Sequence, residues 1–202
     1  MSEYDHEPVR GLPEELPEGE YMIWQDAPDW KRMVASALHI RLTLLYFAII
    51  AGAALLGGNP GTAGVMVLFA VAVTGFFALY AYGVGRTCVY TLTNKRIVMR
   101  VGVALNKCIN IPLSEIETAN LKLTGGGAGN IVLSLKGMPR MGYTMLWPHA
   151  RSLRLVRPQP MLRAVPDAAK VARLLFEATV LVQPVTKKAE AAPEPAMEGL
   201  TA

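Results

Sequence analysis

The chain has 202 residues, 52% of them hydrophobic, and a mean hydropathy of +0.30, so it holds one apolar anchor and one domain of about 100 residues and little else. The formal net charge of +4 hides a balance of −8 in residues 1–30 and of +15 in residues 31–188. This segregation suits a basic domain held against anionic lipid, or one that the acidic segment neutralises within the fold, and the two cysteines lack the spacing of a metal site.

Residues 1–18 are acidic and interrupted by prolines, and we expect a flexible segment there. They lack the apolar run of a secretory signal. Residues 19–36 are expected to hold a first strand, at about 19–25, followed by the segment that enters the membrane. Trp30 in this segment has the character of an anchor at the surface of a bilayer.

Residues 37–85 contain two apolar segments, at 37–56 and 61–84. At a rise of about 1.5 Å per residue, each segment is long enough to cross a hydrocarbon core about 30 Å thick. The pattern predicts a transmembrane helical hairpin. The alternative is a pair of helices buried in a soluble core. No charged residue occurs between positions 42 and 85, which argues against a transporter.

Basic residues flank the hairpin on both sides, whereas the loop between its two segments carries no charge. The preference of Lys and Arg for the cytoplasmic side predicts that both termini lie in the cytoplasm. The chain is therefore expected to be a multi-pass membrane protein with reduced cysteines.

Residues 86–182 are expected to form a cytoplasmic domain of short strands, because the apolar residues there alternate. A helix is predicted at 166–182, and a disordered tail at 183–202. The predicted fold is an α+β membrane protein, with a transmembrane hairpin and a small antiparallel β-sandwich or partial barrel that the last helix caps. The predicted strands after the hairpin are 89–92, 97–101, 107–111, 116–123, 131–136, 143–146 and 153–157.

Two groups of residues are candidates for a surface that binds a partner or lipid. A basic group suits anionic headgroups or an acidic patch on a protein, and solvated charge is the alternative. A methionine-rich group suits an irregular partner, and an ordinary core is the alternative. The basic group is Lys95, Arg96, Arg100, Lys107, Arg151 and Arg154, and the methionine-rich group is Met138, Met141, Met145 and Trp147.

Catalytic and nucleic-acid-binding patterns are missing from the sequence. The three histidines share no local spacing with a Ser, Cys or Asp that forms a triad or a metal pair, so we predict no enzyme. The glycine-rich run at 125–130 lacks the ending of a phosphate-binding loop, so it is predicted to connect two strands. No aromatic platform interleaves the basic residues, which argues against nucleic acid.

Several short runs are similar to a known family. They are 90–98 followed by Gly102, 111–116, and Gly19-Glu20 followed by Trp24. On these runs the chain resembles the bacterial PH domain family of membrane proteins. The resemblance implies a split PH-like domain, whose first strand precedes the hairpin and whose remainder follows it.

A second set of runs, at 7–13, 16–20, 24–25, 28–30 and 143–151, resembles the photosynthetic complex assembly proteins of purple bacteria. This resemblance implies a non-enzymatic factor in the intracytoplasmic photosynthetic membrane. Its implied partners are reaction-centre subunits, with a secondary effect on the light-harvesting antenna.

Alternatives to the assembly role stay open. One is a membrane module that binds anionic lipid. Another is a protein that holds bacteriochlorophyll through the imidazole of His39, and no other cofactor is expected. A homodimer is a further arrangement that the sequence allows.

Overall fold

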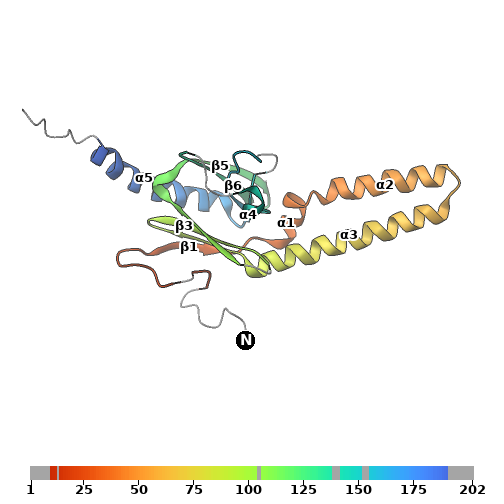
Figure 1. The fold of residues 1–202 in the computed structure, drawn as a ribbon, viewed down its shortest axis with the longest axis horizontal. Helices are drawn as coiled ribbons and strands as arrows, with labels where there is room; N and C mark the ends of the chain where they lie inside the picture. Colours follow the sequence, from red (N-terminus) through yellow and green to blue (C-terminus); the bar gives the residue numbers. More distant parts are fainter. Residues whose placement is uncertain (1–9, 13, 104–105, 138–141, 152–154, 191–202) are drawn as a thin grey trace, which may run out of the picture.

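Strands from both sides of the helical segments come together in the computed structural model of the chain, which describes residues 10–190 except 13, 104–105, 138–141 and 152–154 (Figure 1). The described strands form two antiparallel sheets, ordered β1-β2-β3-β4 and β5-β6-β7. The elements are β1 (Met22–Asp26), α1 (Trp30–Ala37), α2 (Ile40–Leu56), α3 (Pro60–Thr87), β2 (Val89–Thr93), β3 (Arg96–Val101), β4 (Lys107–Pro112), the 3-10 turn η1 (Leu113–Glu115), β5 (Ile116–Gly125), β6 (Ala128–Leu135), α4 (Tyr143–Leu146), β7 (Met161–Val165) and α5 (Ala168–Glu190).

The first strand joins the sheet across the helical insertion. β1 precedes the helices and pairs antiparallel with β2, which follows them, with Gln25 opposite Thr91 and Asp26 opposite Tyr90. The predicted strand before the hairpin is therefore confirmed. The helices start and end beside neighbouring strands, so the sheet is continuous although its chain is interrupted.

The helix predicted at 37–56 begins at Ile40 instead, and a separate helix, α1, precedes it. α1 ends at Ala37, and His39 has a φ of 49°, in the left-handed region that a helix of L-residues does not propagate. α1 packs against α3 and β7, whereas α2 and α3 extend together away from the sheets (Figure 1). The break at His39 lets the chain turn from the domain into the helical pair.

The helical pair differs in length from the prediction. Among the described residues, α3 is the one helix of at least 18 residues that is apolar enough to cross a membrane, and α2 has 17 residues. Only 6% of the most apolar window of α3 is buried, and no residue of α2 is buried. The alternative of two helices buried in a soluble core of this chain is therefore wrong. Large apolar side chains point outward from both helices, among them Leu42, Leu45, Ile49, Leu68, Phe76 and Leu79.

Strands β2 to β6 occur where the alternation predicts them, but the sixth and seventh predicted strands are wrong. The segment 143–146 is α4, because the N–H groups of Met145 and Leu146 bond to the Gly142 carbonyl and close a single turn. Residues 155–157 are bends, and 152–154 lie outside the described residues. The missed strand β7 lies between two prolines and includes a buried arginine, which breaks the alternating pattern.

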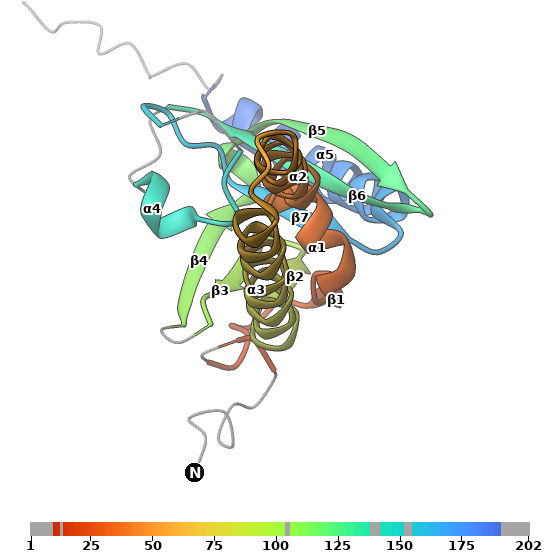
Figure 2. The ribbon, with the colours of Figure 1, turned by 90° about the vertical axis from the view of Figure 1, so that its right-hand side faces the viewer.

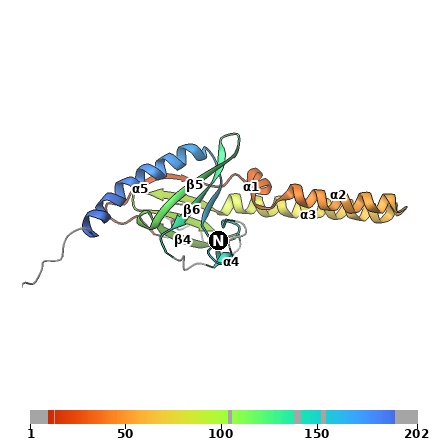
Figure 3. The same ribbon diagram turned by 90° about the horizontal axis from the view of Figure 1, so that it is seen from above.

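The last helix covers the second sheet. α5 packs against β5, β6, β7 and η1, with Val171 and Leu175 buried on its inner face (Figure 3). The helix runs to Glu190, past residue 183, where the tail is predicted to begin.

Part of the N-terminal segment is packed, although we expect residues 1–18 to be flexible. Leu12 is 2% exposed. The Arg10 carbonyl accepts a hydrogen bond of 2.7 Å from the Gln25 side chain, and the Arg10 guanidinium donates to the Arg86 carbonyl over 3.1 Å. This stretch therefore ties the N-terminal segment to β1 and to the end of α3.

Candidate functional site

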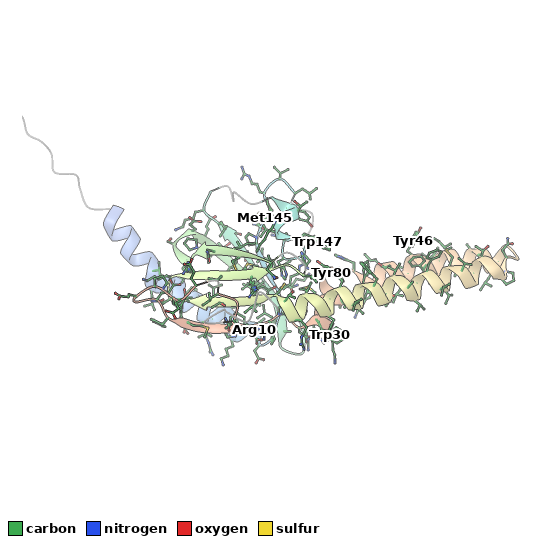
Figure 4. All side chains as sticks on the ribbon, turned by 60° about the horizontal axis from the view of Figure 1, so that its bottom comes forward. Arg10, Trp30, Tyr46, Tyr80, Met145 and Trp147 are labelled. Carbon is green, nitrogen blue, oxygen red and sulfur yellow. The ribbon has the colours of Figure 1, made fainter. Side chains whose placement is uncertain are left out.

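Aromatic side chains surround the base of the helical pair, where α3 meets the sheets (Figure 4). Trp30 of α1 meets Tyr82 edge to face, with 5.9 Å between the ring centroids. Tyr80 lies 5.5 Å from Trp147, which follows α4. Figure 2 shows α1 and α4 on opposite sides of α3, so the two pairs flank the helix. Tryptophan and tyrosine gathered at one level are typical of the boundary between lipid and water.

The distance from this base to the far end of the pair matches a bilayer. From Pro60 to Leu79, α3 advances about 30 Å, the thickness of a hydrocarbon core. α2 is about 25 Å long, near the lower limit for a spanning helix. Lys31 and Arg86 lie over the rings of Trp30 and Tyr82 at 5.7 and 6.0 Å. Cations therefore accompany the aromatic rings at the polar end of the helices.

α4 presents two of the predicted contact residues beside α3. Leu146 is fully buried and anchors the turn, whereas Met145 is 41% and Trp147 48% exposed. Both side chains extend outward near the base (Figure 4). Met138 and Met141, the other members of the methionine-rich group, lie outside the described residues. The structure thus keeps Met145 and Trp147 as an exposed apolar pair on a fixed support.

A buried polar cluster fixes the segment that carries Trp147. His149 has no solvent exposure; its Nδ1 lies 2.6 Å from the Tyr90 hydroxyl, and its Nε2 lies 3.5 Å from the Cys88 sulfur. The Arg163 backbone N–H donates to the Tyr90 oxygen over 3.2 Å. The Tyr90 hydroxyl thus bonds both Arg163 and Nδ1, and the tautomer of the imidazole sets which atom donates in its contacts with Tyr90 and Cys88. These bonds connect the α4 segment to β2 and β7.

The cluster is neutral near pH 7. Burial, together with the charge of Arg163, lowers the pKa of His149 to about 3. Burial also raises the pKa of Cys88 and places the pKa of Tyr90 well above its ordinary value. A buried thiol beside a neutral imidazole is not a thiolate nucleophile. The Cys88–His149 contact joins the segment after α4 to the end of α3.

The turn between β2 and β3 holds the N-terminal segment. Arg96 Nε and the Thr93 hydroxyl each donate to the Glu20 carboxylate over 2.8 Å, and the Asn94 side chain donates to the Gly19 carbonyl over 3.0 Å. The Glu20 side chain is 3% exposed. Burial opposes its ionisation, but the hydrogen bonds from Arg96 and Thr93 outweigh burial and hold the pKa of Glu20 below its ordinary value. The two runs that carry the family resemblance therefore contact each other.

The residues predicted as a basic surface do not come together. Arg96 faces Glu20, and Arg100 is only 5% exposed because both faces of β3 are covered. Lys95 and Lys107 are exposed but lie at opposite ends of β3, about 20 Å apart at the rise of a strand. Arg154 lies outside the described residues. In the structure the Arg96 side chain bonds Glu20 instead of lying on an open basic surface.

Arg151 instead shares a polar cavity with His39. The cavity has a volume of about 470 Å³ and lies where α2 leaves the domain. Sequence reasoning missed the two other cations in it, Lys122 of β5 and Arg163 of β7. In the β5–β6 hairpin, Lys122 lies opposite Asn130, so both residues are on the same face of the sheet. This strand register is the information that identifies Lys122 as a cavity residue. Its lining residues are His39, Asn120, Leu121, Lys122, Asn130, Val132, Arg151, Met161 and Arg163.

The position of His39 gives no support to pigment ligation. It is exposed, precedes α2 and lines the polar cavity. An apolar groove of about 680 Å³ lies between α2 and α3, but its lining does not include His39. Among the described residues, no group of three or more His, Cys, Asp or Glu is placed to hold a metal ion.

The chain is similar to a known family and to individual proteins. Residues 40–179 match the bacterial PH domain family. An "uncharacterized 23.7 kDa protein in puhA 5′ region" of Rhodobacter capsulatus is 38% identical over 186 residues, which cover 87% of each chain. A crystal structure of a DUF1696 family protein with a pleckstrin-homology domain, from Shewanella loihica PV-4, is 12% identical and covers 46% of this chain and 71% of that one, with a TM-score of 0.31.

Proposed function

The chain belongs to the bacterial PH domain family, and from that premise we propose that it is a non-enzymatic assembly factor of the photosynthetic reaction centre, of the PuhB type. The observation that carries the proposal is the relative from the puhA 5′ region, which is similar over nearly the whole length of both chains. The position of this relative in the puhA 5′ region is consistent with a role related to photosynthesis. The resemblance to photosynthetic complex assembly proteins adds the reaction centre as the object of that role.

The proposed protein sits in the inner, intracytoplasmic membrane with α2 and α3 across the bilayer. Support comes from the outward apolar side chains of both helices, the aromatic rings at their base and the uncharged loop at their far end. The distribution of Lys and Arg favours a cytoplasmic location for both termini and for the two sheets. Retention in the membrane after carbonate washing is the measurement that tests the anchoring.

The proposed contact surface for a reaction-centre subunit is the exposed pair Met145 and Trp147 on α4. Large aromatic and thioether side chains dominate the energy of many protein interfaces. Here the buried Leu146 and the His149 cluster hold the turn in place, so little ordering is required on binding. The pair also lies beside Tyr80 of α3, where it is accessible to a partner that is itself embedded in the membrane.

Complementation of a deletion strain tests the proposal. We expect deletion to lower the reaction-centre yield, and to a smaller degree the antenna, without abolishing pigment synthesis. A chain with Met145→Ala and Trp147→Ala, present at the wild-type level, should leave the yield low because the contact surface is gone. Phe176→Ala is the matched control, since Phe176 is 69% exposed on the distant helix α5. Normal reaction-centre levels in the deletion strain would refute the assembly role.

An anionic-lipid-binding module is the second candidate function. The specific observation that favours it is the polar cavity at the start of α2, which contains several cations. Lipid binding and assembly are compatible, because a bound headgroup would fix the orientation of the domain on the membrane.

A further inference from the structure

The polar cavity at the start of α2 is built from residues that are far apart in the chain. His39 comes from the break between α1 and α2, Lys122 from β5 and Arg163 from β7. Arg151 follows the α4 segment and completes the basic lining. The volume of about 470 Å³ falls in the ordinary range for sites that bind small molecules. The fold, not local sequence, gathers these cations.

Charge in the cavity has one sign. Lys122, Arg151 and Arg163 are cationic, and none of the residues that line it in the described part of the chain is acidic. A concave surface lined by cations concentrates positive potential and attracts anions. Desolvation of Arg163, which is 4% exposed, is offset when an anion enters.

The polar side chains around the cavity are held in place by the surrounding structure. Arg163 donates to the Ala150 carbonyl over 2.8 Å, and Arg151 donates to the Gln159 side chain over 3.1 Å. The Asn130 side-chain oxygen Oδ1 accepts from the Ala164 N–H over 2.9 Å. The side-chain NH₂ group of Asn130 keeps its two hydrogens as donors. Guanidinium and amide donors fixed in this way suit the several oxygens of a phosphate.

We propose that this cavity binds the phosphate of an anionic lipid headgroup from the cytoplasmic leaflet. A lipid is favoured over a free anion because His39 immediately precedes Ile40, where the apolar helix α2 begins. The cavity thus lies at the level where headgroups meet a membrane-spanning helix. The inference rests on the membrane anchoring proposed above, and it does not require the contact with a reaction-centre subunit.

Titration of the full chain in an uncharged detergent tests the cavity. The probes are short-chain phosphatidylglycerol, short-chain phosphatidylcholine and inorganic phosphate. We expect phosphatidylglycerol to bind at least tenfold more tightly than either of the others. A chain with Lys122→Gln and Arg151→Gln should lose at least tenfold in affinity for it. Both side chains lie at the surface, so the fold is expected to survive.

The matched control carries Lys95→Gln and Lys107→Gln, which remove the same charge from exposed positions on the other sheet. Less than a threefold loss in this control supports a site in the cavity. An equal loss in both chains would mean general attraction to charge and would overturn the proposal. Inorganic phosphate that binds as tightly as phosphatidylglycerol would overturn the lipid assignment, as would displacement of the lipid by an acidic peptide at equal concentration.

The result of the lipid titration can be distinguished from the results that test the proposed function. Extraction of the wild-type chain by carbonate would remove the membrane anchoring, whatever the titration gives. A low reaction-centre yield in the Met145 and Trp147 variant, together with unchanged affinity for phosphatidylglycerol, would leave both proposals standing on separate residues.

Discussion

The helical pair and the sheet domain place their polar and apolar groups in opposite ways. In α3 the most apolar window is 6% buried, and side chains such as Leu68 and Leu79 point outward. In the sheet domain the polar side chains of Thr93, His149 and Arg163 lie inside, each under 5% exposed. The first arrangement is stable next to hydrocarbon, and the second only where each buried polar group finds a partner.

The difference shows what holds each region in shape. α2 and α3 depend on general apolar character, so many substitutions of one apolar residue by another should be tolerated. The sheet domain depends on particular hydrogen bonds, such as those from Tyr90 to His149 and from Arg96 to Glu20. Losing one partner leaves a buried group without its bond, which costs more than a lost apolar contact at the surface.

Breaking the polar cluster of the domain should have the largest effect. His149→Ala removes a fully buried side chain and leaves the Tyr90 hydroxyl without its side-chain hydrogen-bond partner. We expect a loss of about 3–5 kcal/mol in the free energy of unfolding, measured by denaturant unfolding of the full chain in detergent. Cys108→Ala, at an exposed thiol, is the control and should change stability little. A change as small in the histidine variant would show that the cluster is not structural.

Placing a charge on the helical pair tests the other half of the comparison. Leu68→Arg lies near the middle of the stretch Pro60–Leu79 of α3, where an arginine costs about 2.5–3.5 kcal/mol of insertion free energy if the helix spans a bilayer. We expect less of this variant to stay in the membrane after carbonate washing. Leu123→Arg, at a side chain 57% exposed on β5, should change stability by about 0.5 kcal/mol or less. Equal retention of both variants would contradict the membrane location.

Acidification should weaken the sheet domain in a defined window. The unfolded state takes up a proton at histidine near pH 6.5, whereas folded His149 stays neutral down to about pH 3. Its contribution is complete above pH 6.5 and is lost as the pH falls through this window, at about 1.4 kcal/mol per pH unit at most. The lowered pKa of Glu20 adds a loss of the same sign below the ordinary pKa of a carboxyl group. Unfolding curves at several pH values measure the slope, which should be shallower for His149→Gln.

The sequence predicted the elements that follow a simple period. Strands β2 to β6 were predicted, because each alternates, and the capping helix was predicted, because Val171 and Leu175 recur at helical spacing. The strand β7 was missed, because a buried arginine interrupts the alternation and prolines bracket it. The break at His39 was missed for another reason, because hydropathy and periodicity do not predict a residue with left-handed backbone angles.

The candidate contact residues have different surroundings in the structure. Met145 and Trp147 are exposed, and their role in a contact surface stays a prediction. Arg96 and Arg100 were predicted to be surface charges. Arg96 instead faces Glu20, and Arg100 is buried in a strand that is covered on both faces. Whether a charged side chain faces solvent depends on which segment packs over it, and that information lies far away in the chain.

By itself, the sequence determined that this protein has two long apolar segments and an alternating β-rich remainder with a final helix, because periodicity and hydropathy are local properties. Only the tertiary structure decided that the two apolar helices face outward, that Glu20 meets Arg96, that His149 meets Tyr90, and that His39, Lys122, Arg151 and Arg163 share one cavity. Those contacts join residues far apart in the chain, and folding alone brings them within hydrogen-bonding distance or around a common space.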